Sequence, residues 1–359
     1  MADSKQAPLD AEAAAKAAFA SVQNQPFPND IFTAPELRWA VIGCGVIANQ
    51  MAQSLALAGR KLAGVANRTL SKAQAFAEQY GVEKVYETVE DLYADPDIDA
   101  VYITTPHNTH ITYLRAALAA GKHVLCEKAI TLNSAELDEA RAIADEHNVV
   151  LMDATTVLHM PLYQELRRRM DAGDFGRMNL AQLNFGSYKE YGDLTNRFYN
   201  RSLAGGAMLD IGVYALSVMR LFMASQPVEV VSLGNTCETG VDVASGIVCR
   251  NAEQQLGVVS LTLHSKQPKR SVISFDKCYI EVNEYPRADH ATIVWTADGR
   301  REEVHAGTEA YALCYEMADL EKAVAGDDSK RELLDYASDV MELMTKLRAD
   351  WGVVYPEEE

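Results

Sequence analysis

Three side chains that can hold or move a proton stand far apart in this sequence: Lys128, Asp210 and Tyr214. Asp210 and Tyr214 are four residues apart in an apolar stretch that predicts a helix, so they share one helix face. A buried carboxylate is costly unless it is paired, and Lys128, which follows a predicted strand, is its natural partner. Since an ammonium group favours a nearby phenolate, this set predicts that Tyr214, with an ordinary pKa of about 10, removes a proton from a hydroxyl group.

Each of these residues also has a purely structural interpretation. Taken alone, Lys128 is a surface lysine in a loop. Asp210 stabilises the first turn of its helix through the helix dipole, and Tyr214 packs in the core with its hydroxyl on a backbone group. Gly212 inside the predicted helix costs about 1 kcal/mol relative to Ala, which indicates that a cofactor ring or another helix approaches closely there.

A glycine-rich turn between a short apolar strand and a helical pattern predicts a phosphate site. Gly43 permits a tight turn, Gly45 lets backbone approach a pyrophosphate, and Ala48 lets the helix pack against the strand. The N–H groups that open the helix, at Val46 and Ile47, would hold the phosphates. Such a motif alone is equally compatible with a mere strand–helix turn, so its weight depends on the neighbouring elements.

The end of the second predicted strand bears on the choice of nucleotide. An acidic residue about 20 positions after the glycines would bind the ribose 2′-hydroxyl of NAD, but this region reads Asn67-Arg68 with Lys72 one turn further on. Asn67 can bind a ribose, and Arg68 can pair with a 2′-phosphate. NADP is therefore the predicted cofactor. An exposed Arg68 on a solvated helix start, with NAD as cofactor, is the alternative.

Two polar turns follow later predicted strands, whose carboxyl ends face the ligand crevice of a parallel sheet. Thr105, Pro106 and Asn108 in the first turn, and Glu127 and Lys128 in the second, are predicted cofactor contacts. His110 is either a further contact or a residue that caps and orients the next helix. We predict no metal site, because the two histidines of the first turn have no third ligand at a fitting spacing.

The substrate is expected to contact Lys128, Asp210 and Tyr214. Two further expected contacts are His159, which follows the sixth predicted strand, and Arg197. Lys189, Tyr191 and Arg201 lie in the same polar stretch as Arg197. They are further candidates for binding hydroxyl or anionic groups. The alternative is that these residues are loop residues without a role.

The elements that must position these residues divide the chain into three parts. Residues 1–36 form an extension. Alternating strands and helices over residues 37–156 predict a doubly wound parallel sheet of the Rossmann type. Successive short strands over residues 157–359 predict an α/β domain with a mainly antiparallel sheet. The chain is therefore expected to be an α/β protein with a dinucleotide-binding domain and a substrate domain.

Composition excludes several kinds of partner. The chain has 359 residues, 33 basic against 51 acidic, and a net charge of −18. Phosphate backbones and anionic membranes are thus poor partners, and we predict neither nucleic acid nor membrane binding. The apolar stretch 207–224 contains Asp210 and Arg220 and predicts a buried helix. Six scattered cysteines without a C-x-x-C pair favour a reduced, cytoplasmic protein.

Four motifs, taken together, resemble one known family. They are GCGVIA at 43–48, TPHNTH at 105–110, HVLCEKA at 123–129 and AGGAMLDIGVYAL at 204–216, with WGVVYP at 351–356 closing the chain. The sequence resembles the Gfo/Idh/MocA family over residues 37–355. Within that family it is most similar to the branch of dimeric dihydrodiol dehydrogenases and NADP-linked xylose dehydrogenases.

The resemblance implies a Rossmann domain followed by an α/β domain whose open-faced sheet makes oligomer contacts, here in a homodimer or homotetramer. It implies hydride transfer to or from a nicotinamide on sugars, inositols or related alcohols. Lys128 corresponds to the lysine of the family's EKP motif, and Ala129 stands where the family usually has Pro. Asp210 corresponds to its helix-borne Asp, and Tyr214 to a position that is His in many members.

We therefore expect an NADP-dependent oxidoreductase that acts on a hydroxyl-bearing carbon of a sugar, cyclic polyol or dihydrodiol. Asp210 would orient Lys128 or a substrate hydroxyl. One alternative is a non-catalytic, cofactor-sensing regulatory protein of the same fold, and another is the same enzyme with NAD. The joint presence of Lys128, Asp210 and Tyr214 favours an enzyme over a sensor.

Overall fold

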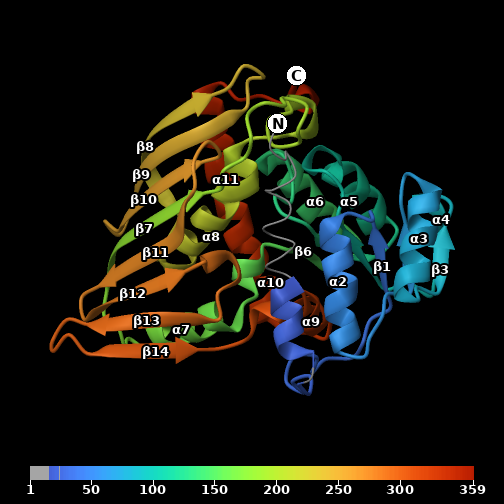
Figure 1. Ribbon diagram of the computed structural model, residues 1–359, viewed down its shortest axis with the longest axis horizontal. Helices are drawn as coiled ribbons and strands as arrows, with labels where there is room; N and C mark the ends of the chain where they lie inside the picture. Colours follow the sequence, from blue (N-terminus) through green and yellow to red (C-terminus); the bar gives the residue numbers. More distant parts are fainter. Residues whose placement is uncertain (1–15, 24) are drawn as a thin grey trace.

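Two sheets with helices between them organise the chain (Figure 1). The structure is a computed structural model that describes residues 16–23 and 25–359, so residues 1–15 and 24 of the predicted extension lie outside the described residues. Residues 16–22 are helical. The two sheets lie on opposite sides of the division proposed between residues 156 and 157.

The first sheet is parallel, and its six strands have the order β3-β2-β1-β4-β5-β6. Its strands are β1 (Trp39–Ile42), β2 (Gly64–Ala66), β3 (Lys84–Tyr86), β4 (Ala100–Ile103), β5 (His123–Cys126) and β6 (Leu151–Asp153). All residues of β1 and β4 are buried, as expected for central strands covered on both faces. The strand order reverses direction between β1 and β4, where doubly wound sheets bind ligands.

Helices cover both faces of this sheet. They are α2 (Val46–Leu57), α3 (Leu70–Tyr80), α4 (Val89–Ala94), α5 (His110–Ala119), α6 (Ser134–Glu146) and α9 (Ala312–Val324). Helix α9 comes from the last sixth of the chain, yet its apolar residues Leu313, Met317 and Leu320 belong to one buried cluster with Met51 and Leu55 of α2. The late part of the chain thus completes the cover of the early sheet.

The second sheet has eight strands in the order β14-β13-β12-β11-β7-β10-β9-β8, and only the β7–β10 pair is parallel. The strands are β7 (Met178–Gly186), β8 (Pro227–Thr236), β9 (Asp242–Asn251), β10 (Leu256–Thr262), β11 (Gln267–Phe275), β12 (Cys278–Asn283), β13 (His290–Trp295) and β14 (Arg301–His305). The fold is therefore α/β with a parallel sheet and a second, mainly antiparallel sheet, as predicted.

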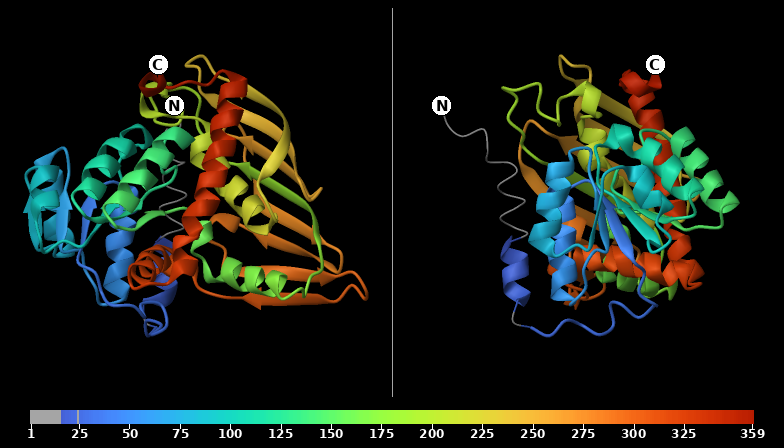
Figure 2. Two further views of the ribbon diagram at one scale, coloured as in Figure 1. Left: turned by 180° about the vertical axis from the view of Figure 1, so that it is seen from behind. Right: turned by 90° about the vertical axis from the view of Figure 1, so that its right-hand side faces the viewer.

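One face of the second sheet packs on helices, as Figure 2 shows from behind. These helices are α7 (Pro161–Asp171), α8 (Val213–Phe222) and α11 (Leu333–Trp351), with the short α10 (Asp328–Arg331) before α11. The opposite face exposes large apolar side chains of β8 and β9, including Val231, Leu233 and Val248. This is the open face that the family resemblance implies.

The segment Arg201–Phe222 is long and apolar enough to cross a membrane, with a mean hydropathy of 1.4. However, 83% of its most apolar window is buried inside the protein. It is therefore built as a core segment, in keeping with the prediction from Asp210 and Arg220.

Candidate active site

The glycine turn lies where the strand order of the first sheet reverses. Gly43 has φ +103°, and a Cβ atom added to it would lie 2.6 Å from Thr104 Oγ1 at the end of β4. Only glycine fits this position, because both the backbone angle and the space exclude a side chain. The sequence interpretation of Gly43 as a tight-turn residue agrees with this geometry.

Helix α2 begins directly after the turn with its N–H groups uncapped. Gly45 is the N-cap residue, with no side-chain cap and no acidic residue in the first turn. A Cβ atom added to Gly45 would meet no atom within 4 Å, and Val46 beside it is 60% exposed. Ala48 is fully buried in the cluster that contains Val41. This cradle fits the pyrophosphate of a dinucleotide, which Gly45, Val46 and Ile47 would hold through backbone N–H groups.

The loop after β2 and the first turn of α3 present two cations near this cradle. Arg68 is exposed and forms no hydrogen bond or ion pair with the rest of the described chain. Burial raises the pKa of the Cys44 thiol to about 11, and the charge of Lys72 partly opposes this, so Lys72 lies close to the glycine turn. Asn67 Nδ2 donates to the Thr69 carbonyl oxygen at 3.0 Å, which shapes the loop. Arg68 is thus free to pair with a 2′-phosphate.

Lys128, Asp210 and Tyr214 meet beyond the end of β5. Lys128 Nζ donates to the Asp210 carbonyl oxygen at 2.6 Å and to Asp210 Oδ1 at 3.2 Å. The same ammonium nitrogen lies 4.8 Å from the centre of the Tyr214 ring. The peptide bond between Lys128 and Ala129 is cis. Residues that are more than 80 positions apart in the chain therefore form one contact group, as the sequence analysis expected.

A change in helical bonding precedes Tyr214. Residues Met208–Gly212 form a π-helical turn, in which the Val213 N–H group donates to the Met208 carbonyl oxygen, and α8 begins at Val213. Such turns often occur at functional sites. The close approach predicted at Gly212 is real, but its cause is different. An added Cβ atom would meet Met208 Sδ at 2.8 Å and Leu261 Cδ1 of β10 at 3.0 Å, so strand packing rather than a cofactor ring requires this glycine.

The Lys128–Asp210 pair is charged. Burial raises the pKa of Asp210, but the charges of Lys128 and Arg197 outweigh it and hold that pKa well below its usual range. Burial likewise lowers the pKa of Lys128, and the charges of Asp210 and Tyr214 reverse this so that the pKa ends above its ordinary value. Each group therefore keeps its partner ionised.

Tyr214 is placed to exchange a proton with a ligand. Its hydroxyl group forms no hydrogen bond with any other described residue. Burial raises its pKa, and the Lys128 ammonium lowers it by a smaller amount, so the pKa lies above 10. The ammonium group thus shifts the Tyr214 pKa in the predicted direction, but in this structure it does not bring that pKa close to neutral pH.

The first polar turn is tied mainly to the protein itself. Asn108 Nδ2 donates to Glu357 Oε1 at 2.7 Å and to the Ser202 carbonyl oxygen at 3.3 Å. These bonds use the Asn108 Nδ2 group, whereas its Oδ1 atom is buried without a hydrogen-bond partner among the described residues, so the cofactor contact of Asn108 stays a prediction. Thr105 Oγ1 accepts a bond from Thr109 at 2.8 Å, and Pro106 precedes the short helical turn that leads into α5.

His110 and Glu127 are held from within. The His110 ring nitrogens lie 3.0 Å from the Ala129 carbonyl oxygen and 2.8 Å from that of Thr105, and the side chain is fully buried. This geometry favours the orienting role over a direct cofactor contact. Glu127 accepts a hydrogen bond from the Tyr102 hydroxyl and another, at 3.2 Å, from the Lys128 N–H group. Burial raises the Glu127 pKa.

His159, a predicted substrate contact, forms its contacts inside the protein. The side chain is fully buried, with Nδ1 3.1 Å from Asp319 Oδ2 of α9 and Nε2 2.8 Å from the Asp153 carbonyl oxygen. Both ring nitrogens therefore serve the protein interior, and neither is available to a substrate. The turn after β6 directs this residue beneath α9, which strand order alone does not reveal.

The polar stretch before α8 divides into two groups. Arg197 Nη2 lies 3.7 Å from Asp210 Oδ1, and Lys189 Nζ lies 4.1 Å from the Phe198 ring, so both belong to the active-site region. Arg201 instead pairs with Glu359 and donates to the Val354 carbonyl oxygen. Tyr191 stacks edge-on with the rings of Tyr199 and His264.

Sequence reasoning missed Arg287, which joins the two halves of the molecule. Its Nη1 donates to Gln50 Oε1 of α2 at 3.1 Å, and its charge lowers the pKa values of both Glu127 and Tyr214.

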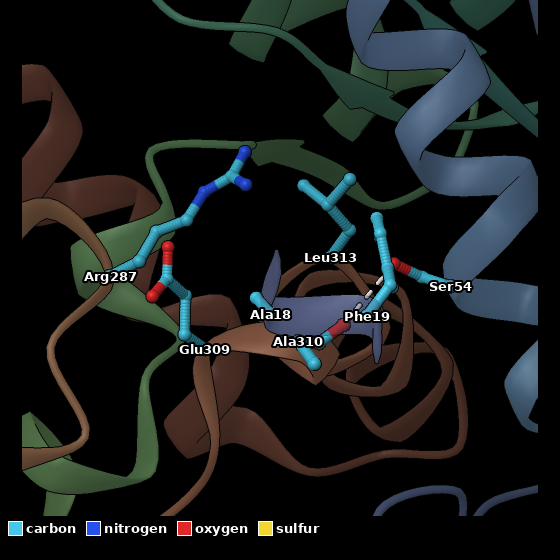
Figure 3. A pocket seen from close by; sticks show the side chains of 7 residues that line it. All are labelled: Ala18, Phe19, Ser54, Arg287, Glu309, Ala310 and Leu313. Carbon is cyan, nitrogen blue, oxygen red and sulfur yellow. Dashed lines mark hydrogen bonds between the residues drawn. The ribbon is translucent and has the colours of Figure 1, made fainter. Parts of the chain in front are cut away.

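Figure 3 shows Arg287 beside a cavity of about 10 Å³, room for about one water molecule. The cavity is lined by Ala18, Phe19, Ser54, Arg287, Glu309, Ala310 and Leu313. Its size excludes it as the substrate site.

Two protein-family models match this chain. Residues 37–155 match the GFO_IDH_MocA model, described as an oxidoreductase family with an NAD-binding Rossmann fold. Residues 163–281 match the model of the GFO/IDH/MocA C-terminal domain. The two matches cover the first sheet and most of the second.

Curated relatives extend the similarity across most of the chain. The trans-1,2-dihydrobenzene-1,2-diol dehydrogenase of Xenopus tropicalis is 31% identical over 251 residues, which are 68% of this chain and 74% of the relative. The enzyme of the same name from Sus scrofa is 27% identical over 336 residues, which are 90% of this chain and 99% of the relative.

Solved structures share the fold. A 3-ketoreductase from Actinomadura kijaniata, in complex with NADP and TDP-benzene, superposes with a TM-score of 0.75 at 24% identity, covering 88% of this chain and 98% of that one. A levoglucosan dehydrogenase in complex with NADH and levoglucosan gives a TM-score of 0.76 at 21% identity, covering 87% and 97%. At such identities the likeness shows the fold alone.

Proposed function

Because this chain belongs to the Gfo/Idh/MocA family of oxidoreductases, we propose that it transfers a hydride between C4 of the NADP nicotinamide and a hydroxyl-bearing carbon. The substrate class is a sugar, cyclic polyol or dihydrodiol. One observation carries the proposal: Lys128, Asp210 and Tyr214 form one contact group beyond the end of β5, in the sheet whose glycine turn fits a dinucleotide. The bound nicotinamide supplies or accepts the hydride.

Each member of the contact group has a task in this reaction. Tyr214, whose hydroxyl has no partner in the described chain, accepts the proton of the substrate hydroxyl. Lys128 holds that hydroxyl with its remaining donor capacity, since two of its bonds go to Asp210. Asp210 fixes the position of the ammonium group and keeps it charged.

The test of this proposal is NADP reduction, and NADPH oxidation in the reverse direction, across a panel of sugars, inositols and diols. We expect turnover with at least one member of the panel. Tight NADPH binding with no turnover on any member would contradict the proposal and favour a cofactor-sensing regulatory protein. NAD in place of NADP is tested separately, by the variant that follows.

Replacement of Arg68 by Ala is expected to weaken NADPH binding by about 1–3 kcal/mol, the scale of a charge-assisted hydrogen bond. NADH binding should not change, because NADH has no 2′-phosphate. Fluorescence titration of both nucleotides against wild type and variant measures the difference. Arg300→Ala, which removes another exposed arginine far along the chain, is the matched control. Equal losses for NADPH and NADH would contradict the NADP assignment.

We further propose that the open face of the second sheet joins two copies of this chain in a homodimer or homotetramer. Val231 is 75% exposed and Leu233 82%, and Val231 pairs in register with the exposed Val248 of β9. Contiguous exposed apolar side chains of this kind typically mark protein contacts. All six cysteines are free, which supports the further proposal of a reducing, cytoplasmic location.

Replacement of Leu233 by Asp is expected to shift the protein to the monomer, because a carboxylate at the centre of an apolar contact loses its hydration. Sedimentation velocity at micromolar concentration measures the change. Val354→Asp, at an exposed apolar residue outside the open face, should leave the oligomer intact. A monomeric wild type, or an unchanged oligomer in Leu233→Asp, would rule out this interface.

A further inference from the structure

Three cations surround a single carboxylate in the active site. Lys128 Nζ lies 3.2 Å from Asp210 Oδ1, and Arg197 Nη2 lies 3.7 Å from the same oxygen. The charge of Lys189 also lowers the pKa of Asp210, which places this third cation nearby. Positive charge is therefore in local excess, although the whole chain has a net charge of −18.

Two of these cations are positioned by one aromatic ring. Lys189 Nζ and the guanidinium carbon of Arg197 each lie 4.1 Å from the centre of the Phe198 ring. Phe198 is itself buried, with 9% exposure. The backbone of Lys189 is fixed as well, since its N–H group donates to the Leu263 carbonyl oxygen at 2.7 Å and its carbonyl oxygen accepts from Tyr199. Both cations therefore lie against one aromatic ring, with Lys189 half-buried and the Arg197 side chain 61% exposed.

This pair lacks a counter-ion of its own. Within residues 16–23 and 25–359, no carboxylate lies within ion-pair distance of Lys189, and Arg197 has only Asp210, which Lys128 already holds at a shorter distance. Burial lowers the pKa of Lys189, and so do the charges of Arg197, Lys128 and Lys269. Lys269 is itself paired with Glu284 at 2.9 Å. Lys189 and Arg197 thus bring more positive charge to this region than the carboxylates within ion-pair distance balance.

Other nearby groups do not supply that anion. Burial lowers the pKa of His107 to about 3, so its ring is neutral. Glu127 is occupied elsewhere, because it accepts hydrogen bonds from the Tyr102 hydroxyl and from the Lys128 N–H group. The glycine turn at Gly45 and the exposed Arg68 are assigned to nucleotide binding. They lie on other loops, after β1 and β2.

We propose that the substrate carries an anionic group, a carboxylate or a phosphate, which Lys189 and Arg197 bind while its hydroxyl-bearing carbon lies at Lys128 and Tyr214. This inference rests on the proposed function and narrows its substrate class to sugar acids and sugar phosphates. Arginine forms two parallel bonds to such planar or tetrahedral oxyanions, and lysine adds a point charge. A neutral polyol leaves both cations uncompensated.

Ligand binding to the NADP-loaded protein tests the inference without relying on turnover. The probes are D-glucuronate, D-glucose 6-phosphate and neutral D-glucose, titrated by calorimetry at low salt. We expect at least one anionic probe to bind about 10- to 100-fold more tightly than D-glucose, as charge-assisted hydrogen bonds predict. The better of the two anions distinguishes a carboxylate from a phosphate substrate.

Variants then assign the effect to the pair. Lys189→Gln and Arg197→Gln should each weaken binding of the anionic probe about tenfold and change D-glucose binding less than twofold. Lys189→Arg should retain most of the affinity for the anionic probe. In turnover assays the same variants should raise KM for the anion more than they lower kcat. Arg115→Gln, an exposed arginine on α5 paired with Glu139, is the control and should leave binding unchanged.

Two results would overturn the inference. One is equal binding of the anionic and neutral probes by the wild type, and the other is an equal loss for all probes in the variants. Turnover of neutral sugars without any preference for anions would leave the proposed function intact and refute only the anionic substrate. Tight anion binding without turnover of any probe would support the anion site and contradict the proposed reaction.

Discussion

Replacement of Tyr214 by Phe is expected to lower kcat for NADP-linked alcohol oxidation by about 10²- to 10⁴-fold, the usual contribution of a positioned proton acceptor. The substitution removes only the hydroxyl oxygen. The ring keeps its contact with the Lys128 ammonium nitrogen, 4.8 Å from its centre, and the hydroxyl makes no bond that holds the described fold together. Steady-state kinetics followed by NADPH absorbance measures the loss, and cofactor titration should show unchanged NADPH affinity.

The pH profile separates this role from a structural one. Because burial raises the Tyr214 pKa above its ordinary 10, the phenolate fraction increases about tenfold per pH unit throughout the neutral range. Alcohol oxidation by the wild type should therefore accelerate as pH rises from 7 to 9, and the Phe variant should lose that dependence. A Tyr214→Phe enzyme with wild-type rates, or with the same pH profile, would remove Tyr214 from the chemistry.

Replacement of Lys128 by Met is expected to lower kcat/KM by about 10³-fold or more, within the range for loss of a positioning charge in a reaction centre. Methionine keeps the length of the side chain and removes the ammonium group. Asp210 then retains Arg197, at 3.7 Å, and the weaker influence of Lys189. Tyr214 loses the charge that lowers its pKa most. The same kinetic assay measures the loss.

A matched substitution distinguishes lost chemistry from lost folding. Lys346→Met changes an exposed lysine on α11 that pairs with Asp350, and it should leave the rate unchanged. Thermal unfolding and NADPH titration of both variants complete the comparison. If Lys128→Met turned over substrate as fast as Lys346→Met, Lys128 would have no part in the reaction.

The parts of this molecule that could be predicted from the sequence depend on local signals. The apolar run of β1 followed by Gly43 and Gly45 specifies a strand, a turn and a helix within a few residues, and the structure confirms these elements. The pairing of Lys128 with Asp210 was predicted for a similar reason. A carboxylate in an apolar helix needs a cation, and the family motifs singled out Lys128.

The parts that could not be predicted depend on contacts between distant segments. Nothing in the residues around His159 indicates that Asp319, 160 positions later, would occupy its Nδ1 atom. The bond from Arg287 to Gln50 spans 237 positions. Likewise, the sequence around Phe198 does not reveal that Lys189 and Arg197 share its ring.

Short or irregular elements also escaped prediction. Strand β3 has three residues and helix α4 has six, too few for a periodic apolar pattern to appear. The predicted helix over residues 207–224 is in fact a π-helical turn followed by α8. Its sequence has one apolar pattern throughout, so nothing in that pattern marks the residue at which the bonding changes.

The placement of α9 has a consequence for how the chain is made. Leu313, Met317 and Leu320 cover the same apolar surface as α2, yet the ribosome synthesises them roughly 250 residues after that helix. Until they are synthesised, the nascent nucleotide-binding half exposes this apolar surface to solvent. Such surfaces bind chaperones or self-associate. The amino-terminal half therefore depends on α9 to cover its apolar surface, and it cannot be separated from the rest of the chain unchanged.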